Sequence, residues 1–339
     1  MAFREAGNVK PTLDDIARAA GVSRATVSRV VNDVPGVTGA VRQRVRDVIA
    51  ELGYVPDETA RALARGRQSA VDVVAATPDP AGVGQLGTHP YYSRVLAGVM
   101  GALAGRDVQL RVHAVTPDAS EETVDRIAQR ASVGIVLADG SPALAVRLQQ
   151  QCRRVVSLVA TARSVAAIEA ENLDGAYAAV KYLHRLGRRR IAEIPGPADV
   201  SCGVDRRAGY LRAVAELGLD DLSAAGGFTR EAGHRAAHEL LERYPDLDAL
   251  FVACDLTAAG AVQAITETGR SVPYDVSVIG FDDSIAAVCS NPPLSTVRMP
   301  VEDMAAAATR LLLTDSVRAG HRERFPVELV LRGSTTERG

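Results

Sequence analysis

The sequence lacks the features of membrane proteins and of proteins stabilised by disulfides. Among its 339 residues, no stretch reaches the roughly 18 uninterrupted apolar residues of a membrane helix. The opening MAFREAGNVK also lacks the apolar segment of a signal peptide. The four cysteines form no CxxC pair, so neither a zinc ribbon nor a dithiol redox motif is supported. We therefore expect a cytoplasmic protein without membrane contact, in which Cys152, Cys202, Cys254 and Cys289 are small buried hydrophobic residues.

Motifs of common enzymes are also missing. No histidine has HExxH spacing, and neither a GxSxG elbow nor a GxxxxGK[ST] loop occurs. His234 and His238 lie four residues apart without a third ligand, which favours a solvated helix face over a metal site. Gly82, Gly84 and Gly87 spell GxGxxG, but a His-Pro pair separates them from the next helix, so we interpret this segment as a loop at a pocket mouth. We predict no enzymatic activity, no metal and no cofactor.

The chain has little net charge, but that charge is unevenly distributed. The formal net charge is -2. Residues 1–69 hold 11 Lys and Arg against 8 Asp and Glu, whereas the remainder holds 28 against 33. This bias is small, and it favours contact between the N-terminal segment and a polyanion.

The N-terminal segment has the pattern of three short helices. Thr12 can cap the first, Gly21 breaks it, and Ser23 can cap a second helix that carries Val27 and Val30 on one side. Two short helices joined by a tight turn containing Gly are typical of a helix-turn-helix. Apolar residues at helical spacing predict the third helix: Val41, Val45, Val48, Ile49 and Leu52.

From residue 71 onward, short β-branched runs alternate with amphipathic helices. Predicted strands are VDVVAAT, VQLRVHAV, GIVLAD, VVSLVA, RIAEIPG, ALFVAC, VSVIGF and FPVELVL. Helices are predicted near 91–104, 120–130, 142–151, 174–186, 204–217, 230–243, 255–268 and 301–313. This alternation indicates parallel sheets with helices on both faces, and its length favours two α/β lobes with a ligand cleft at the carboxyl ends of the strands.

Several segments resemble the lactose-repressor family of transcriptional regulators. They are TLDDIARAAGVSRATVSRVVND at 12–33, VRDVIAELGYVPDETARALARG, YLHRLGRRRIAEIPGP, RRAGY, DVSVIGFDD and NPPLSTV. The resemblance implies a helix-turn-helix headpiece at 1–56, a hinge at 57–69 and a core at 70–339 like that of periplasmic binding proteins. Within the core it implies one lobe at about 70–163 and 292–324, and another at about 164–291 and 325–339.

The resemblance also implies a function. The chain would bind a pseudo-palindromic double-stranded operator as a homodimer, most often as a repressor, under the control of a small molecule between the lobes. Base edges would be read by Arg24, Ala25 and Arg29, and an arginine can contact guanine with two hydrogen bonds. Phosphates would be contacted by the polar residues Thr12, Ser23, Thr26, Ser28 and Asn32. For Thr26 and Ser28 the alternative is a plain exposed helix surface.

Leu63 aligns with the hinge leucine of the family, which is a wedge inserted into the minor groove. Arg61 lies in the same Arg-rich segment, DETARALARGRQS, which we expect to become helical on DNA. Two alternatives remain for this segment: packing of Leu63 against the core, or a solvated linker.

Effector contacts follow from the same resemblance. Arg206 in RRAGY and Asp282 in GFDD match the recurrent polar contacts of the family, with an inter-lobe salt bridge as the alternative. Tyr91, Tyr92 and Phe228 fall at its aromatic positions, where a flat apolar wall suits a sugar ring or a nucleobase.

Some pocket positions depart from relatives that respond to sugars. Val159 stands where many relatives have Asp, and Cys254 stands where they have Asn. Val200 and Cys202 are apolar where hydroxyls are frequent. These departures leave a polyhydroxyl sugar with fewer hydrogen-bonding partners, so three effector classes stay open: a sugar, a sugar derivative and a nucleobase-like molecule. The alternative function is that of a solute-binding protein that does not regulate through DNA, and the headpiece argues against it.

Overall fold

The computed structural model describes residues 12–31, 36–52, 69–76, 83–116 and 119–337, of which 83–85 are described by their backbone alone. The chain divides into two compact units, Met1–Gln68 and Ser69–Gly339. Asn32, Arg61 and Leu63 lie outside the described residues. Within the part described, no helix is long and apolar enough to cross a membrane.

Three helices make the headpiece: α1 (Leu13–Ala20), α2 (Arg24–Val31) and α3 (Gly39–Leu52). Thr12 caps α1 in a reciprocal capping box with Asp15. Gly21 ends α1 with φ 63°, the left-handed conformation that glycine adopts without strain, so the chain turns sharply into α2. The helices enclose a small apolar core made of Ile16, Ala17, Ala20, Val27, Val30 and Val45.

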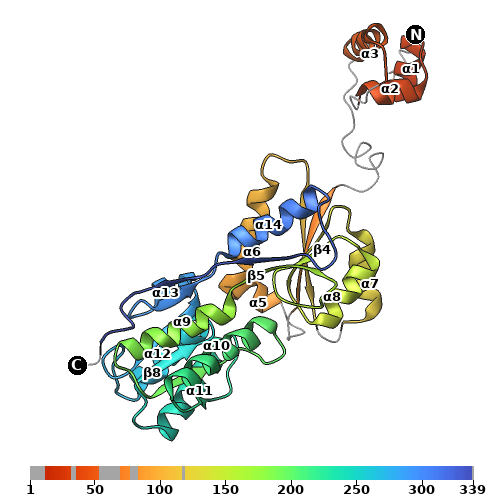
Figure 1. Ribbon diagram of the computed structural model, residues 1–339. Helices are drawn as coiled ribbons and strands as arrows, with labels where there is room; N and C mark the ends of the chain where they lie inside the picture. The colour runs from red at the N-terminus through yellow and green to blue at the C-terminus, as the bar shows by residue number, and fades with distance from the viewer. Residues whose placement is uncertain (1–11, 32–35, 53–68, 77–82, 117–118, 338–339) are drawn as a thin grey trace, which may run out of the picture. The chain divides into compact units, whose positions relative to one another are not determined.

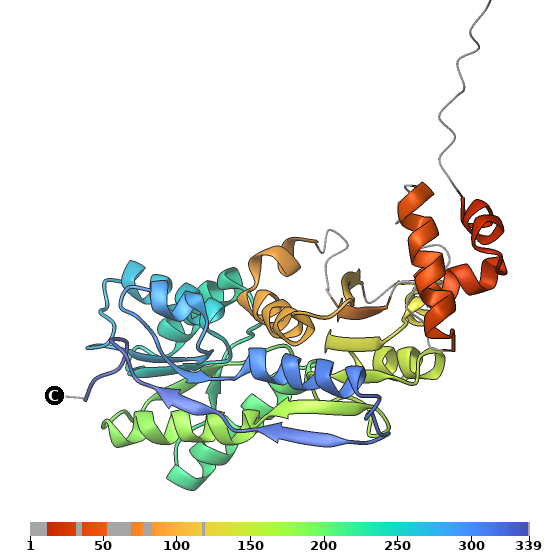
Figure 2. The same cartoon turned by 90° about the horizontal axis from the view of Figure 1, so that it is seen from above.

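The second unit contains two lobes, each built on a six-stranded sheet (Figures 1 and 2). The first lobe has the order β11-β5-β4-β3-β1-β2, and all its strand pairs are parallel. Its strands are β1 (Ala70–Ala76), β2 (Gln109–Val115), β3 (Gly134–Asp139), β4 (Val155–Ser157), β5 (Ala166–Ala170) and β11 (Arg322–Phe325).

The second lobe has the order β12-β10-β9-β8-β6-β7, and only the pair β10 and β12 is antiparallel. Its strands are β6 (Ile191–Ile194), β7 (Leu222–Ser223), β8 (Ala249–Val252), β9 (Ser277–Asp282), β10 (Ser295–Arg298) and β12 (Glu328–Val330). The two α/β lobes confirm the predicted fold class.

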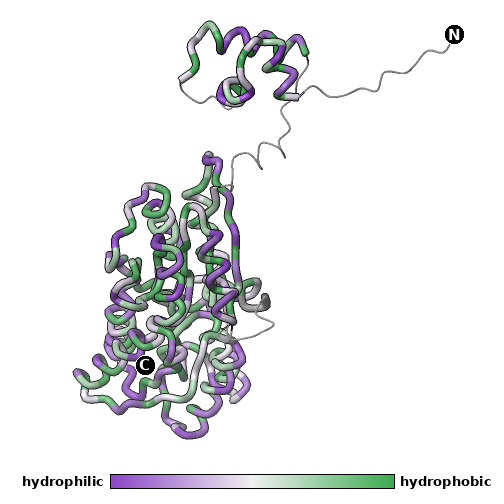
Figure 3. Tube along the Cα trace, turned by 90° about the vertical axis from the view of Figure 1, so that its right-hand side faces the viewer, coloured by the Kyte–Doolittle hydropathy of each residue, from purple (hydrophilic) through white to green (hydrophobic). Residues whose placement is uncertain are grey.

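Helices cover both faces of each sheet. The first lobe carries α5 (Val83–Thr88), α6 (Pro90–Leu103), α7 (Glu121–Arg130), α8 (Pro142–Gln151) and α14 (Val301–Leu313). The second carries α9 (Asn172–Arg185), α10 (Ser201–Leu217), α11 (Arg230–Arg243), α12 (Asp255–Glu267) and α13 (Ile285–Cys289). Hydrophilic and hydrophobic residues alternate along these helices (Figure 3), as expected where one side packs on a sheet.

Successive residues of the central strands point to opposite faces. In β3, Val136 packs in the cluster that contains α6 and α14, whereas Ile135 and Leu137 pack with α7 and α8. In β8, Phe251 and Leu250 divide in the same way between two clusters. Buried strands covered on both faces are the reason that the sequence shows continuous apolar runs instead of strict alternation.

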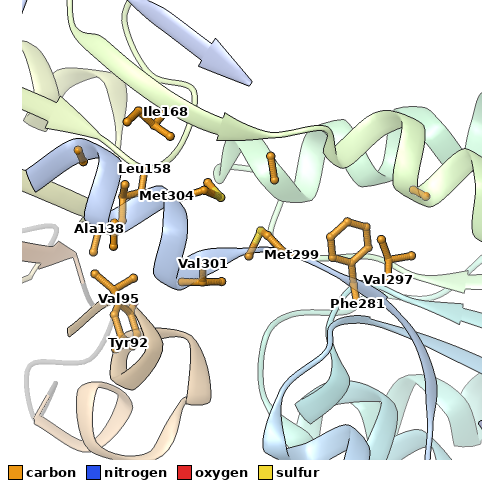
Figure 4. Packing of buried hydrophobic residues seen from close by; sticks show 14 of the residues in the cluster. Tyr92, Val95, Ala138, Leu158, Ile168, Phe281, Val297, Met299, Val301 and Met304 are labelled. Atoms are coloured by element: carbon orange, nitrogen blue, oxygen red, sulfur yellow. The ribbon is translucent and has the colours of Figure 1, made fainter. Parts of the chain in front are cut away.

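The two lobes share one hydrophobic cluster. Met299 lies in the crossing segment between Phe281 of the second lobe and Val301 and Met304 at the start of α14 (Figure 4). Close packing of α6 on α14 supports this junction, since a Cβ at Gly98 would lie 2.2 Å from a backbone oxygen of α14. The lobes are therefore coupled through packed side chains.

The structure differs from the sequence expectations at several places. The segment containing Gly84 and Gly87 forms helix α5 rather than a loop. Strand β5 belongs to the first lobe and β10 to the second, whereas the expected boundaries placed each in the other lobe. Their parallel pairing, β5 with β4 and β10 with β9, decides this membership. Two cysteines are not buried as expected: Cys289 is exposed because it ends a short surface helix, and Cys202 is only half-buried because it lines a cavity.

Candidate functional site

Helix α2 presents the three predicted base-reading residues on its exposed side. Arg24, Ala25 and Arg29 are exposed, whereas Val27 and Val30 are buried in the small core. The two faces follow the helical period, so the packing that holds α2 in place leaves its polar side available.

An acidic residue of α1 contacts this face. Nε of Arg24 lies 3.7 Å from Oδ1 of Asp14, and both side chains are largely exposed. Exposed ion pairs of this kind contribute about 0–1 kcal/mol to the free energy of unfolding. The pair therefore orients Arg24 only weakly, and the guanidinium can exchange Asp14 for a DNA group at little cost.

The predicted phosphate-contacting hydroxyls also cap helices. The Thr12 hydroxyl donates to Oδ2 of Asp15 at 2.6 Å. Thr12 is exposed, so its side chain is oriented by this hydrogen bond and not by burial. Oγ of Ser23 accepts the backbone N–H of Thr26 at 3.1 Å, and the two hydroxyls lie 2.9 Å apart. Ser28 is half-buried. Thr12 and Ser23 stand at the N-terminal ends of α1 and α2, where backbone N–H groups favour anions, whereas Ser28 lies within α2.

The six predicted effector residues come together in one cavity. Its volume is about 1130 Å³, slightly above the usual range for small-molecule pockets. Both lobes contribute: Tyr91 and Tyr92 from α6, Arg206 from α10, Phe228 before α11, Cys254 at the start of α12, and Asp282 at the end of β9.

Arg206 and Asp282 form a buried ion pair at the base of this cavity. Nη2 of Arg206 lies 3.3 Å from Oδ1 of Asp282, and its Nε donates to Oδ1 of Asn172 at 2.9 Å. The guanidinium lies 3.7 Å from the centroid of the Phe281 ring. Both partners belong to the second lobe, so the pair lies within one lobe and is not the inter-lobe bridge considered from the sequence.

Asp282 is held in an unusual backbone conformation. Its φ of 109° is one that residues with a Cβ rarely adopt, and such conformations cost about 1–3 kcal/mol. Nη1 of Arg94, from the first lobe, donates to its carbonyl oxygen at 2.7 Å. The surrounding contacts therefore fix where this carboxylate stands.

A second buried carboxylate adjoins Asp282. Asp255 accepts the Ser284 backbone N–H at 2.7 Å and the Thr296 hydroxyl at 2.5 Å. Burial, together with the neighbouring charge of Asp282, raises the pKa of Asp255 to about 7. Burial also raises the pKa of Asp282, against the opposing effect of Arg206. The base of the cavity thus holds less negative charge than its two carboxyls would carry in water.

Aromatic rings form one wall of the cavity. The rings of Tyr91 and Tyr92 meet edge to face with centroids 5.4 Å apart, and His89 contacts both Tyr92 at 6.0 Å and Phe228 at 6.4 Å. The Tyr91 hydroxyl donates to the carbonyl of Ala138 at 2.7 Å, which fixes its ring. Since Phe228 belongs to the second lobe, this aromatic contact joins the two lobes across the cavity.

The apolar substitutions noted in the sequence also line the cavity. Val159, Val200, Cys202 and Cys254 all contribute to its surface. Sγ of Cys254 lies 3.1 Å from the hydroxyl of Thr257, so that thiol has a partner already. These positions offer a ligand few hydrogen bonds.

The sequence did not point to several polar residues of the lining, among them His89, Asp139, Asn172 and Asp199. Asp139 ends strand β3, and ligands of open α/β sheets bind at the carboxyl ends of strands, so this position could have been found. Burial raises the pKa of Asp139 to about 6. Neither His89 nor Asn172 stands in a motif that the sequence marks.

Two family models match the chain. Residues 12–57 match the bacterial regulatory proteins of the lacI family, and residues 180–335 match a periplasmic binding protein-like domain. The first match covers the three helices of the headpiece, and the second lies mainly on the second lobe.

Relatives match along nearly the whole chain. The HTH-type transcriptional regulator CelR of Thermobifida fusca is 34% identical, over 95% of this chain and 96% of its own length. The HTH-type transcriptional repressor CytR of Escherichia coli strain K12 is 29% identical, over 96% of each chain.

Solved structures agree with these relatives. A complex of CelR with cellobiose has a TM-score of 0.72 at 32% identity, over 96% of this chain and 99% of that chain. A lac repressor dimer bound to operator and the anti-inducer ONPF has a TM-score of 0.80 at 26% identity, over 97% and 100%. The likeness therefore includes both the headpiece and the two lobes.

Proposed function

This chain belongs to the lacI family of bacterial regulatory proteins, and from that membership we propose how its residues recognise DNA and effector. It is an effector-regulated transcriptional regulator that binds operator DNA, and it is not an enzyme. We propose that it acts as a homodimer on a pseudo-palindromic operator, because a two-fold site is matched by a two-fold protein.

The observation that carries the DNA-reading proposal is the exposed side of α2. Arg24 and Arg29 supply forked donors for guanine edges in the major groove, and Ala25 supplies only a methyl contact. Five polar residues of the headpiece would set the register on the phosphates without reading sequence. These residues are Thr12, Ser23, Thr26, Ser28 and Asn32.

The hinge proposal rests on the sequence of residues 57–69. Leu63 would be inserted between base pairs in the minor groove, and Arg61 would contact the same groove. Unstacking a base step costs a few kcal/mol, which the additional contacts of bent DNA offset.

Within the core, the cavity is proposed as the effector site. Tyr91, Tyr92 and Phe228 would contact a ring, while Arg206 and Asp282 would bind its polar edge, and Cys254 would border it. Sugars, their derivatives and nucleobases all have such a ring and edge. A ligand held by both lobes changes the angle between them and so the separation of the two hinges in a dimer.

Fluorescence anisotropy tests the proposal. The purified chain should bind the DNA upstream of its own gene, or a site obtained by selection from random sequence, despite excess competitor DNA. Affinity should fall steeply with salt concentration, because phosphate contacts release counterions. Leu63→Ala should weaken operator binding without changing binding to competitor. Binding no tighter than to competitor at every selected sequence would instead favour a solute-binding protein.

A further inference from the structure

The charged groups that line the cavity are not balanced. Arg206 is paired with Asp282, and Arg147 is paired with carboxylates of α7. Two lining carboxylates remain, Asp139 at the end of β3 and Asp199 in the loop before α10. Among the described residues, neither has a Lys or Arg within 4.0 Å. The uncompensated charge of the lining is therefore negative.

These two carboxylates come from different lobes. Asp139 belongs to the first lobe and is half-buried at the cavity, with the Tyr92 hydroxyl 3.5 Å from its Oδ2. Asp199 belongs to the second lobe and is exposed at the cavity. Burial raises the pKa of Asp139, and the charge of Asp199 adds to that effect, so the two groups repel one another. A cation between the two carboxylates would offset both the free-energy cost of burying their charge and their mutual repulsion.

The aromatic wall near Asp139 also suits a cation. The faces of the Tyr91, Tyr92 and Phe228 rings have a negative electrostatic potential, because the quadrupole of an aromatic ring attracts cations, and all three residues line the cavity. The remaining surface of the cavity is mostly apolar, so it suits a ligand whose charged group is attached to an apolar ring.

His89 adds one oriented donor. Its Nδ1 accepts the backbone N–H of Tyr91 at 3.2 Å, and burial lowers the pKa of the ring, so the proton of the neutral ring is on Nε2. Nε2 is buried and has no hydrogen-bond partner among the described residues. A bound molecule that supplies an oxygen acceptor would satisfy it.

We propose that the effector carries a basic nitrogen, held as an ammonium group between Asp139 and Asp199, on a ring-shaped body that lies against Tyr91, Tyr92 and Phe228. An acceptor oxygen of the same molecule receives the Nε2 proton of His89. This inference rests on the proposed function of the cavity. Since the two carboxylates stand on opposite lobes, the ammonium group draws the lobes together, which links binding to the change that the DNA-binding unit must sense.

Isothermal titration calorimetry of the full chain near neutral pH tests this inference with matched pairs of compounds. Each pair exchanges one hydroxyl for an amine: glucose and glucosamine, galactose and galactosamine, 2-phenylethanol and 2-phenylethylamine. In at least one pair, the amine should bind about tenfold more tightly, equal to about 1.4 kcal/mol. Asp139→Asn should abolish the preference, and Asp199→Asn, at an exposed position that cannot disturb packing, should reduce it.

Glu242→Gln is the matched control, since it removes the same charge from an exposed position on α11 outside the cavity lining. It should retain the full preference for the amine. Equal binding of both members in every pair, no binding of any amine at millimolar concentration, or an unchanged preference in Asp139→Asn would each overturn the inference.

Operator anisotropy with the same compounds separates this inference from the proposed function. If the chain binds operator and only neutral compounds change its affinity for DNA, the proposed regulatory function is supported and the inference that the effector carries a basic nitrogen is wrong. If the chain binds no operator while calorimetry still shows the amine preference, the proposed function fails and the ligand assignment remains.

Discussion

The headpiece and the core hold their candidate functional residues in opposite ways. On α2, Arg24 and Arg29 stand in solvent, and the packing of the headpiece does not depend on them. In the cavity, Arg206 and Asp282 are buried, paired with each other and bonded to their surroundings. The first arrangement allows recognition to change without loss of stability, whereas the second makes ligand recognition part of what holds the lobe together.

Arg206→Ala should give the largest effect on stability. It leaves Asp282 buried without its cation and removes the hydrogen bond to Asn172, so the core should lose about 3–5 kcal/mol of unfolding free energy. Urea unfolding followed by circular dichroism measures this loss. Arg212→Ala, on the same helix but exposed, should cost less than about 1 kcal/mol. Similar losses in both variants would contradict the contrast between buried and exposed arginines.

Arg24→Ala should change DNA recognition and leave stability unaltered. Loss of a forked donor should reduce discrimination at one base pair by about 1–3 kcal/mol, as measured by anisotropy on operators with single substitutions. Arg44→Ala, which removes a charge from an exposed position on α3, should weaken binding to all these sequences alike. The contrast breaks down if Arg24→Ala lowers the urea midpoint of the chain.

Asp139→Asn should stabilise the core at alkaline pH. The pKa of Asp139 is raised to about 6 by burial, so its contribution to stability is present below about pH 4 and is lost as pH rises through 6. The variant should therefore be more stable than the parent at about pH 8, by on the order of 1 kcal/mol of unfolding free energy, and this difference should shrink as the pH falls toward about 4. Calorimetric scans of both proteins at about pH 8 and about pH 4 measure this difference in stability. A variant that is less stable than the parent at about pH 8 would contradict the prediction.

Thr12→Ala should give the smallest of these effects. It removes the hydroxyl that caps α1, which should destabilise the headpiece by about 1 kcal/mol. Thr12→Ser keeps the hydroxyl and should retain most of that stability. If both variants bind operator less well while the headpiece unfolds normally, Thr12 acts on phosphate and its capping role is secondary.

The sequence predicted best what short segments determine. Caps at Thr12 and Ser23, with the glycine between the helices, suffice to predict α1 and α2, because each signal acts within one turn. The core helices also follow from local periodicity. Lobe membership does not, since β5 and β10 join their sheets by pairing with strands whose positions no local pattern reveals.

Cavity residues divide in a similar way. Arg206 and Asp282 were located through flanking motifs, but their mutual pairing depends on how α10 packs beside β9. His89 was noted only as part of a His-Pro pair, because its role comes from a hydrogen bond to Tyr91 and from burial. Burial of a polar atom is a property of the assembled lobe.

The path of the chain through the lobes has a consequence for gene rearrangement. Each sheet draws strands from both the middle and the end of the chain, so a single exchange within residues 69–339 would combine incompatible halves of a sheet. An exchange at the boundary near residue 68 leaves both sheets whole. One recombination event at this boundary can thus pair this ligand cavity with a new DNA specificity, or this DNA specificity with a new ligand cavity.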